Sequence, residues 1–166
     1  MPLYVLDTNI FIQAHRDTYP LDIATSFWNT LKNLAEEEKI ISIDKVKAEI
    51  DRNEDELNEW IETHLPEGFF KSTEEKEILN NYGLMAPWAE SRSDHYQRGA
   101  IDEFLEFDNA DAWLVAWCKA TGDTLVTQEV SNTQQKRRIP IPQPCDAFDV
   151  KYCNMIEMFR ALQVQF

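Results

Sequence analysis

The sequence has 166 residues, of which 43% are hydrophobic, and this length and composition are typical of one packed globular domain spanning residues 1–166. It carries 30 acidic against 16 basic residues, and the net charge of −14 excludes a basic surface extending over the whole chain. No apolar run approaches the roughly 20 residues that span a bilayer, and no leader pattern follows Met1, so we expect a cytoplasmic protein without a membrane partner.

The first half of the chain alternates short apolar runs with amphipathic segments. Residues 3–6 and residues 40–43 are short apolar runs that indicate buried strands. Asp7 follows the first run and can cap a helix that begins near Ile10. Further helices are expected over residues 21–38, over residues 44–50 with Asp44 as the cap, and over residues 54–64.

The second half has its clearest helical pattern over residues 109–120, where an apolar stripe precedes Gly122. Pro140, Pro142 and Pro144 follow a polar stretch and are expected to exclude regular structure. Other helices are expected over residues 74–82, 95–107 and 155–162, and strands over residues 125–127 and 150–153. The segment 67–98 has no assigned role. Strands that alternate with helices predict an α/β fold with a central, mostly parallel sheet.

Acidic side chains recur near the carboxyl ends of the predicted strands, where open parallel sheets form their sites. Asp7 ends the first strand, and Glu129 lies two residues after Thr127. Asp111 opens the clearest helix, and Glu49 adjoins apolar positions of its own helix. Each has an ordinary alternative role, because acids cap helices and a lone helical glutamate usually faces solvent.

Taken together, these acids indicate a metal site. Three or four carboxylates gathered at one sheet edge repel one another unless a cation joins them. Oxygen ligands suit Mg²⁺ or Mn²⁺, which can activate water for attack on a phosphodiester. The three histidines and three cysteines have no metal-ligand spacing, and the four glycines form no phosphate-binding loop.

Four sequence elements carry a resemblance to a known family. They are Asp7-Thr8-Asn9 after an apolar strand, Glu49-Ile50 on a helix, the Ala-Asp-Ala-Trp-Leu-Val-Ala run at 110–116, and Leu-Val-Thr-Gln-Glu at 125–129. In this order the sequence resembles the PIN-domain nucleases, and among them the VapC-like toxins of toxin–antitoxin systems. The resemblance covers nearly the whole chain. It implies a three-layer α/β/α sandwich and an endoribonuclease that depends on Mg²⁺ or Mn²⁺.

The resemblance also implies the roles of individual residues. Asp7, Glu49 and Asp111 are the core acids, which hold the metal ion and serve catalysis. Glu129 is the fourth acid, at a position where the family usually has Asp, so that either Glu129 or Asp108 completes the site. The supporting residues are Asn9 beside Asp7, Thr127 as a holder of metal-bound water, and Asp108.

The resemblance further implies an RNA substrate, a homodimer and a cognate antitoxin. The dense basic cluster Lys136-Arg137-Arg138 is expected to grip phosphates, unless it is only a solubilising loop. Such antitoxins commonly insert a segment, often with an arginine, among the acids, because a guanidinium pairs well with carboxylates. The acidic residues between positions 36 and 77 are either a second docking surface or a solvated face.

Two alternatives to a ribonuclease and one variation of substrate remain open. A degenerate nuclease fold could serve only as an interaction module. An aspartyl-phosphate phosphatase would use Asp7 as its nucleophile, but that chemistry normally needs a second Asp where this chain has Asn9. The sequence is also compatible with a nuclease specific for DNA, because a metal site binds phosphates and does not contact the 2′-hydroxyl group that distinguishes RNA.

Overall fold

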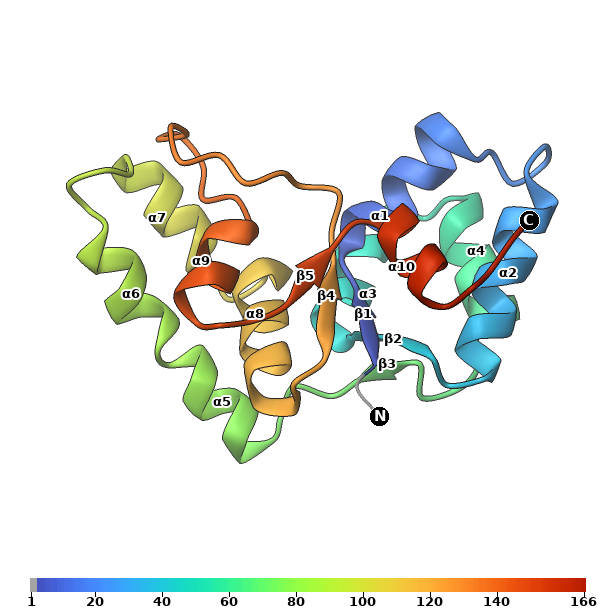
Figure 1. Cartoon of the computed structure of the whole chain (residues 1–166), viewed down its shortest axis with the longest axis horizontal. Coiled ribbons are helices and arrows are strands. Elements are labelled where there is room, and N and C mark those ends of the chain that lie inside the picture. The colour runs from blue at the N-terminus through green and yellow to red at the C-terminus, as the bar shows by residue number, and fades with distance from the viewer. Residues whose placement is uncertain (1–2) are drawn as a thin grey trace.

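The central feature of the computed structural model, which describes residues 3–166, is a five-stranded sheet in which every pairing is parallel. Its strands are β1 (Tyr4–Leu6), β2 (Ile40–Ile43), β3 (Phe70–Lys71), β4 (Thr124–Val126) and β5 (Tyr152–Cys153). The order β3-β2-β1-β4-β5 places β1 in the middle of the sheet (Figure 1). Since Leu6 is in register with Val126, Asp7 and Thr127 leave the sheet side by side at its carboxyl edge.

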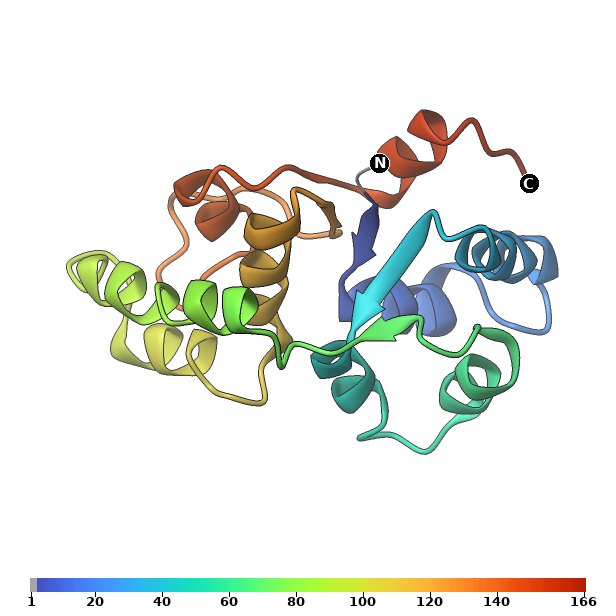
Figure 2. The same cartoon turned by 90° about the horizontal axis from the view of Figure 1, so that it is seen from below.

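Helices cover both faces of the sheet (Figure 1 and Figure 2). On one side lie α1 (Thr8–Gln13), α2 (Thr25–Glu36), α4 (Glu56–His64) and α10 (Met155–Ala161). On the other side lie α5 (Lys76–Tyr82), α6 (Met85–Ser91), α7 (Arg98–Phe104), α8 (Ala110–Thr121) and α9 (Pro142–Ala147). A π-helical turn, η1 (Ala14–Thr18), continues α1, and α3 (Asp44–Ile50) contacts both α1 and α8. The predicted α/β sandwich with a parallel sheet is therefore confirmed.

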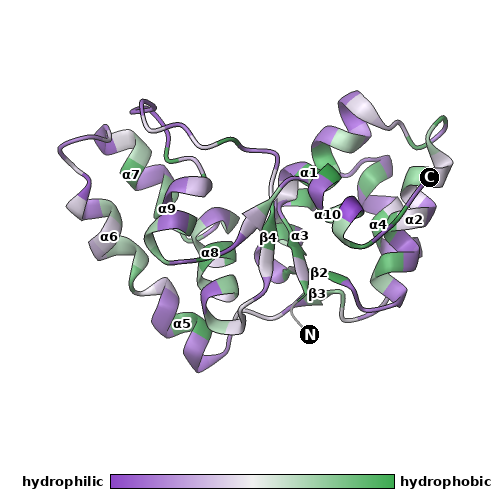
Figure 3. Cartoon of the chain, viewed as in Figure 1, coloured by the Kyte–Doolittle hydropathy of each residue, from purple (hydrophilic) through white to green (hydrophobic). Residues whose placement is uncertain are grey.

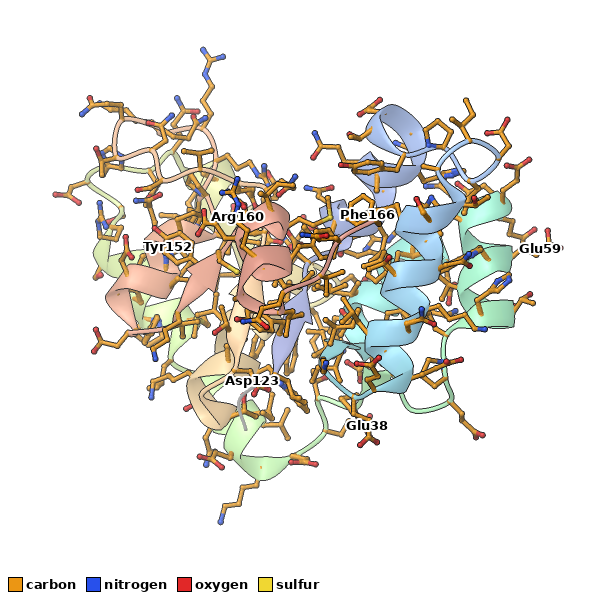
Figure 4. The ribbon with its side chains drawn as sticks, turned by 45° about the vertical axis from the view of Figure 1, so that its right-hand side comes forward. Glu38, Glu59, Asp123, Tyr152, Arg160 and Phe166 are labelled. Atoms are coloured by element: carbon orange, nitrogen blue, oxygen red, sulfur yellow. The ribbon has the colours of Figure 1, made fainter. Side chains whose placement is uncertain are left out.

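The core lies between the sheet and these helices, as the hydrophobic strands in Figure 3 indicate. Every residue of β2 is buried, as expected for a strand covered on both faces. Acidic side chains such as Glu38 and Glu59 instead point outward into solvent (Figure 4). Among residues 3–166, no helix is long and apolar enough to cross a membrane.

The segment 67–98, whose role the sequence does not predict, forms β3, α5 and α6, and its helix α5 packs on α8. The Tyr82 ring stacks on Trp113 with their centroids 3.7 Å apart and their planes 6° apart. Asn81 donates a hydrogen bond from its side chain to the Ala116 carbonyl oxygen over 3.3 Å. Because α5 covers its outer side, α8 is buried from Ala112 to Cys118 without interruption.

Two local predictions are wrong. Asp44 lies inside α3 rather than at its cap, and its carboxylate accepts hydrogen bonds from the backbone N–H and hydroxyl group of Thr73. Pro142 and Pro144 do not exclude regular structure, because both lie in the first turn of α9, where backbone N–H groups need no helical partner. The sequence also gave no sign of β3, which has only two residues.

Candidate active site

Asp7, Glu49 and Asp111 line a single pocket with a volume of about 380 Å³ at the carboxyl edge of the sheet. Asp7 joins β1 to α1, Glu49 lies near the end of α3, and Asp111 lies in the first turn of α8. The chain separates these residues by many positions, but the parallel sheet brings the elements that carry them together. The convergence that the sequence predicts for these three acids is therefore present in the fold.

Asp7 is buried and held by a hydroxyl group. Its side chain is 2% exposed and accepts a hydrogen bond from Thr127 Oγ1 to Oδ2 over 3.0 Å. Asp7 occupies the N-cap position of α1 but makes no side-chain capping bond there, so helix capping does not explain this carboxylate. Burial, together with the nearby charges of Glu129 and Glu49, raises the pKa of Asp7 well above its usual range.

Glu49 connects the starts of two helices. Thr8 Oγ1 donates a hydrogen bond to Glu49 Oε1 over 2.5 Å, and the Ala110 N–H donates to Oε2 over 3.5 Å. Thr8 begins α1 and Ala110 begins α8. Glu49 therefore faces the pocket instead of the solvent that a lone helical glutamate usually faces.

Asp111 and Glu129 share the guanidinium group of Arg138. Arg138 Nη2 lies 3.0 Å from Glu129 Oε1 and 3.6 Å from Asp111 Oδ2. Burial and the charge of Asp111 raise the pKa of Glu129 to about 7, although Arg138 opposes this shift. Burial and the charge of Asp7 also raise the pKa of Asp111 above its usual range. Arg138 thus balances only part of the negative charge that the fold gathers here.

The donor chemistry of this cluster fits a hard divalent cation, since every donor is a carboxylate or hydroxyl oxygen. Glu129 Oε2 is buried and has no hydrogen-bond partner within residues 3–166. In the same residues, however, no three acidic, histidine or cysteine side chains already stand in the arrangement of a metal site. Glu49 is turned to Thr8, and Asp111 and Glu129 to Arg138, so these side chains would have to reorient to hold one ion.

The remaining predicted residues divide into those at the pocket and those outside it. Asn9 lines the pocket, and Thr127 is buried behind Asp7, where its Oγ1 also accepts a hydrogen bond from the Glu129 N–H over 3.1 Å. Asp108 is exposed and does not line the pocket; its backbone carbonyl oxygen accepts a hydrogen bond from Arg52 over 3.0 Å. Glu129 does not line this pocket either, but its carboxylate pairs with Arg138, which does, and its charge raises the pKa of Asp7. Of the two candidates for the fourth acid, Glu129 is therefore the better placed.

The predicted basic cluster is split by the fold. Arg138 lines the pocket, whereas Lys136 and Arg137 are exposed and do not. The loop is anchored before Arg138, because the Gln97 N–H donates to the Lys136 carbonyl oxygen over 2.9 Å. His95 Nε2 lies 2.9 Å from the Gln135 carbonyl oxygen as well. This anchoring directs Arg138, alone of the three, to the acids.

Sequence reasoning missed other residues that line the pocket, notably Arg52, Glu103 and Glu106. Arg52 could have been found, since it follows Glu49 by three positions and so shares its side of the helical turn. Glu103 lies on α7, and its charge contributes to the raised pKa values of Asp111 and Glu129. No local pattern marks Glu103, because its approach depends on how α7 packs.

Comparisons with known proteins agree with this fold. No curated protein sequence matches the chain. Among solved structures, the chain is similar to VapBC2 from Rickettsia felis, determined bound to a DNA fragment from their promoter. The TM-score is 0.52 and the identity 19%, over 92% of this chain and 98% of that chain, a likeness that shows a common PIN-like fold. A family model described as "Domain of unknown function (DUF4411)" matches residues 4–166, and the chain therefore belongs to that family.

Proposed function

We propose that this protein is a metal-dependent endoribonuclease and the toxin of a type II toxin–antitoxin pair. The observation that carries this proposal is the convergence of Asp7, Glu49 and Asp111 on one pocket, with Glu129 joined to it through Arg138. A protein gains no stability from burying acids that raise one another's pKa values. Such an arrangement is expected where a function requires clustered negative charge.

Mg²⁺ or Mn²⁺ is the proposed cofactor, held by Asp7, Glu49, Asp111 and Glu129. When bound, such an ion supplies activation of a water molecule and stabilises the oxygens of the phosphodiester. Thr127 fixes the orientation of Asp7 through its hydroxyl group, as outer hydrogen-bond partners of metal ligands commonly do. Asn9 offers an amide at the pocket wall for hydrogen bonds to substrate or water.

Arg138 is proposed to change partners when the substrate binds. In this structure its guanidinium group pairs with Asp111 and Glu129. If Asp111 and Glu129 held a divalent ion, the Arg138 guanidinium would be released from them and could bind a phosphate oxygen of the RNA, for which its fork geometry is suited. Lys136 and Arg137, which lie outside the pocket, are proposed only as weaker, longer-range contacts to the RNA backbone.

The experiment that tests this function compares wild type with Asp7→Asn on total RNA, in Mg²⁺, in Mn²⁺ and in EDTA. We expect wild type to cleave RNA only with a divalent cation, and Asp7→Asn to lose this cleavage. Glu77→Gln, which neutralises an exposed acid of α5, is the matched control and should cleave as wild type does. A single-stranded DNA substrate distinguishes a DNA nuclease.

The metal binding itself needs a separate measurement, because the acids are not already arranged as a metal site and Arg138 partly neutralises them. These two observations favour the second candidate, a nuclease fold kept as an interaction module. Calorimetric titration with Mn²⁺ separates the two. Heat of binding that is lost in Asp7→Asn supports the enzyme, whereas no binding by wild type supports the interaction module.

A cognate antitoxin and a homodimer are proposed as the protein partners, in the cytoplasm where the RNA substrate is. The acidic pocket is suited to an arginine of the antitoxin, which would displace Arg138. We expect expression of the chain alone to arrest growth, and Asp7→Asn to relieve the arrest. Coexpression with the product of the adjacent gene should yield a stable complex, and a chain that purifies alone would contradict the toxin assignment.

A further inference from the structure

Phe107 exposes an aromatic ring and lies in the chain between residues that line the acidic pocket. It is 62% exposed, more than any other aromatic residue among residues 3–166. Its neighbours Glu106 and Asn109 both line the pocket. Phe166 is also exposed, but it packs against Phe27 and Phe159 at the end of the chain (Figure 4).

The backbone around Phe107 is fixed by specific hydrogen bonds. Trp113 Nε1 donates to the Phe107 carbonyl oxygen over 3.0 Å, and the two rings meet edge to face at 5.6 Å. Asn109 closes the preceding turn, since its backbone N–H donates to Glu106 O and its side chain donates to Glu103 O. The ring is therefore exposed by a well-ordered turn rather than by a loose loop.

Two cations from the α3 segment accompany this ring. Lys45 Nζ lies over the Phe107 ring, 4.0 Å from its centroid. Arg52 donates to the carbonyl oxygen of Asp108, the residue after Phe107, and also lines the pocket. Lys45 lies one helical turn before Glu49 in α3, and Arg52 lies in the turn that follows α3, so the two cations stand on either side of Glu49 in the chain.

We propose that Phe107, Lys45 and Arg52 form a nucleotide-binding subsite, in which an unpaired RNA base stacks on Phe107 and the two cations bind the adjoining phosphates. An exposed ring beside cations is the combination that proteins use to bind single-stranded nucleic acid, because any base can stack on the ring while the cations bind the backbone. The chain has a net charge of −14, which repels RNA, so phosphates are expected to bind at positive side chains such as Lys45 and Arg52. This subsite rests on the proposed ribonuclease function and selects single-stranded RNA as its substrate.

Binding without cleavage tests this subsite. A short, unstructured, fluorescein-labelled RNA is titrated into Asp7→Asn protein in Mg²⁺, and its anisotropy gives Kd. Adding Phe107→Ala or Phe107→Leu should weaken binding at least about fivefold, whereas Phe107→Trp should retain it. Ile23→Ala, which removes another exposed apolar side chain that does not line the pocket, is the matched control and should leave Kd unchanged.

The two cations have their own readout. Lys45→Gln and Arg52→Gln should each reduce the slope of log Kd against log salt by about 0.7, the value for one lost single-strand phosphate contact. Circular dichroism should show that both variants remain folded, and urea unfolding measures any stability lost with the Lys45 contact to the Phe107 ring and the Arg52 hydrogen bond to Asp108 O. A slope that stays at the wild-type value for both variants contradicts the phosphate contacts.

A scan of the RNA with single abasic positions identifies the stacked base. One abasic position should weaken binding to the Asp7→Asn protein but cause no further loss when Phe107 is Ala. Equal losses in both proteins, or wild-type affinity of Phe107→Leu, overturn the stacking proposal even if wild type cleaves RNA. If no RNA binds and Phe107→Ala instead disrupts a complex with the adjacent gene's product, the ring belongs to a protein interface and both the subsite and its RNA substrate are wrong.

Discussion

Arg138 is the single residue on which the charge balance of the acidic pocket most depends. Its guanidinium contacts two of the four clustered acids, and its own side chain is 44% exposed, so it can leave without disturbing the core. A guanidinium among carboxylates occupies the electrostatic position that a divalent cation would take. Cation binding and the Arg138 ion pairs should therefore compete.

This competition predicts the effect of Arg138→Gln on metal affinity. Removing one positive charge close to the acids should tighten Mn²⁺ binding about tenfold, a rough value for a charge partly screened by solvent. Calorimetric titration measures the change. Arg137→Gln is the matched control, because Arg137 is exposed and does not line the pocket. Unchanged or weaker Mn²⁺ binding by Arg138→Gln would mean that Arg138 does not compete with the cation.

Among the single elements, α8 begins with residues that contribute both to the stability of the protein and to the lining of the pocket. Asn109 caps this helix, and its side chain accepts a hydrogen bond from the backbone N–H of Asp111 over 3.0 Å. Asn109 therefore accepts a hydrogen bond from a backbone N–H that has no partner within the helix, and this bond holds the backbone of Asp111 in place. The far end of α8 is closed by Gly122, whose φ of +79° favours glycine, as the sequence predicts.

Asn109→Ala should lower the free energy of unfolding by about 1 kcal/mol, the usual effect of losing a helix cap. It should also weaken Mn²⁺ binding, because the Asp111 backbone loses its hold. Asn154→Ala removes the equivalent cap of α10, where Asn154 Oδ1 accepts from the Glu157 N–H over 2.8 Å, outside the pocket lining. Urea unfolding should give a loss for Asn109→Ala at least as large as for Asn154→Ala, because Asn109 also donates to Glu103 O, and Mn²⁺ binding should be weakened only by Asn109→Ala. If Asn109→Ala and Asn154→Ala bind Mn²⁺ with equal affinity, the Asn109 cap does not contribute to the metal site.

The prediction of elements from sequence succeeded where one helix or strand carries its own signal. The apolar run of β1, the apolar stripe and terminal glycine of α8, and the β-branched β2 are all local patterns. β3 escaped prediction because two residues are too few to show a period, and its pairing with β2 depends on tertiary contacts. α9 escaped because the prolines that begin a helix look the same in sequence as prolines that prevent one.

The same distinction holds for the site. Asp7, Glu49 and Asp111 could be named because each adjoins a recognisable strand or helix. The ion pairs of Arg138 could not be predicted, since they depend on the anchoring of residues 135 and 136 to another loop. Contacts between segments distant in sequence have no periodicity from which to infer them.

For the whole molecule, the buried acids predict how stability depends on pH. The pKa of Glu129 rises from its ordinary 4.5 to about 7, and burial also raises those of Asp7 and Asp111. A carboxyl group with a higher pKa in the folded than in the unfolded protein stabilises the fold at low pH, and this contribution is lost as pH rises. The free energy of unfolding of the metal-free protein should therefore fall between about pH 4.5 and about pH 7.

Urea unfolding in EDTA between about pH 4.5 and about pH 7 measures how the free energy of unfolding depends on pH. Saturating Mn²⁺ should reverse this pH dependence, because it stabilises the ionised acids. Asp7→Asn should make the dependence shallower, while Glu77→Gln, at an exposed position, should leave it as in wild type. A metal-free protein that becomes more stable toward neutral pH would contradict the raised pKa values.

The hydrogen bond between Asp7 and Thr127 joins residues 120 positions apart. A ribosome therefore translates most of this message before the chain can close that bond, and the residues that follow, Glu129 and Arg138, emerge later still. A growing or truncated polypeptide carries the early acids without the neighbours that orient them. The complete cluster of acids should thus exist only after nearly the whole chain has been made, and under the proposed function a partner synthesised earlier has that interval in which to reach it.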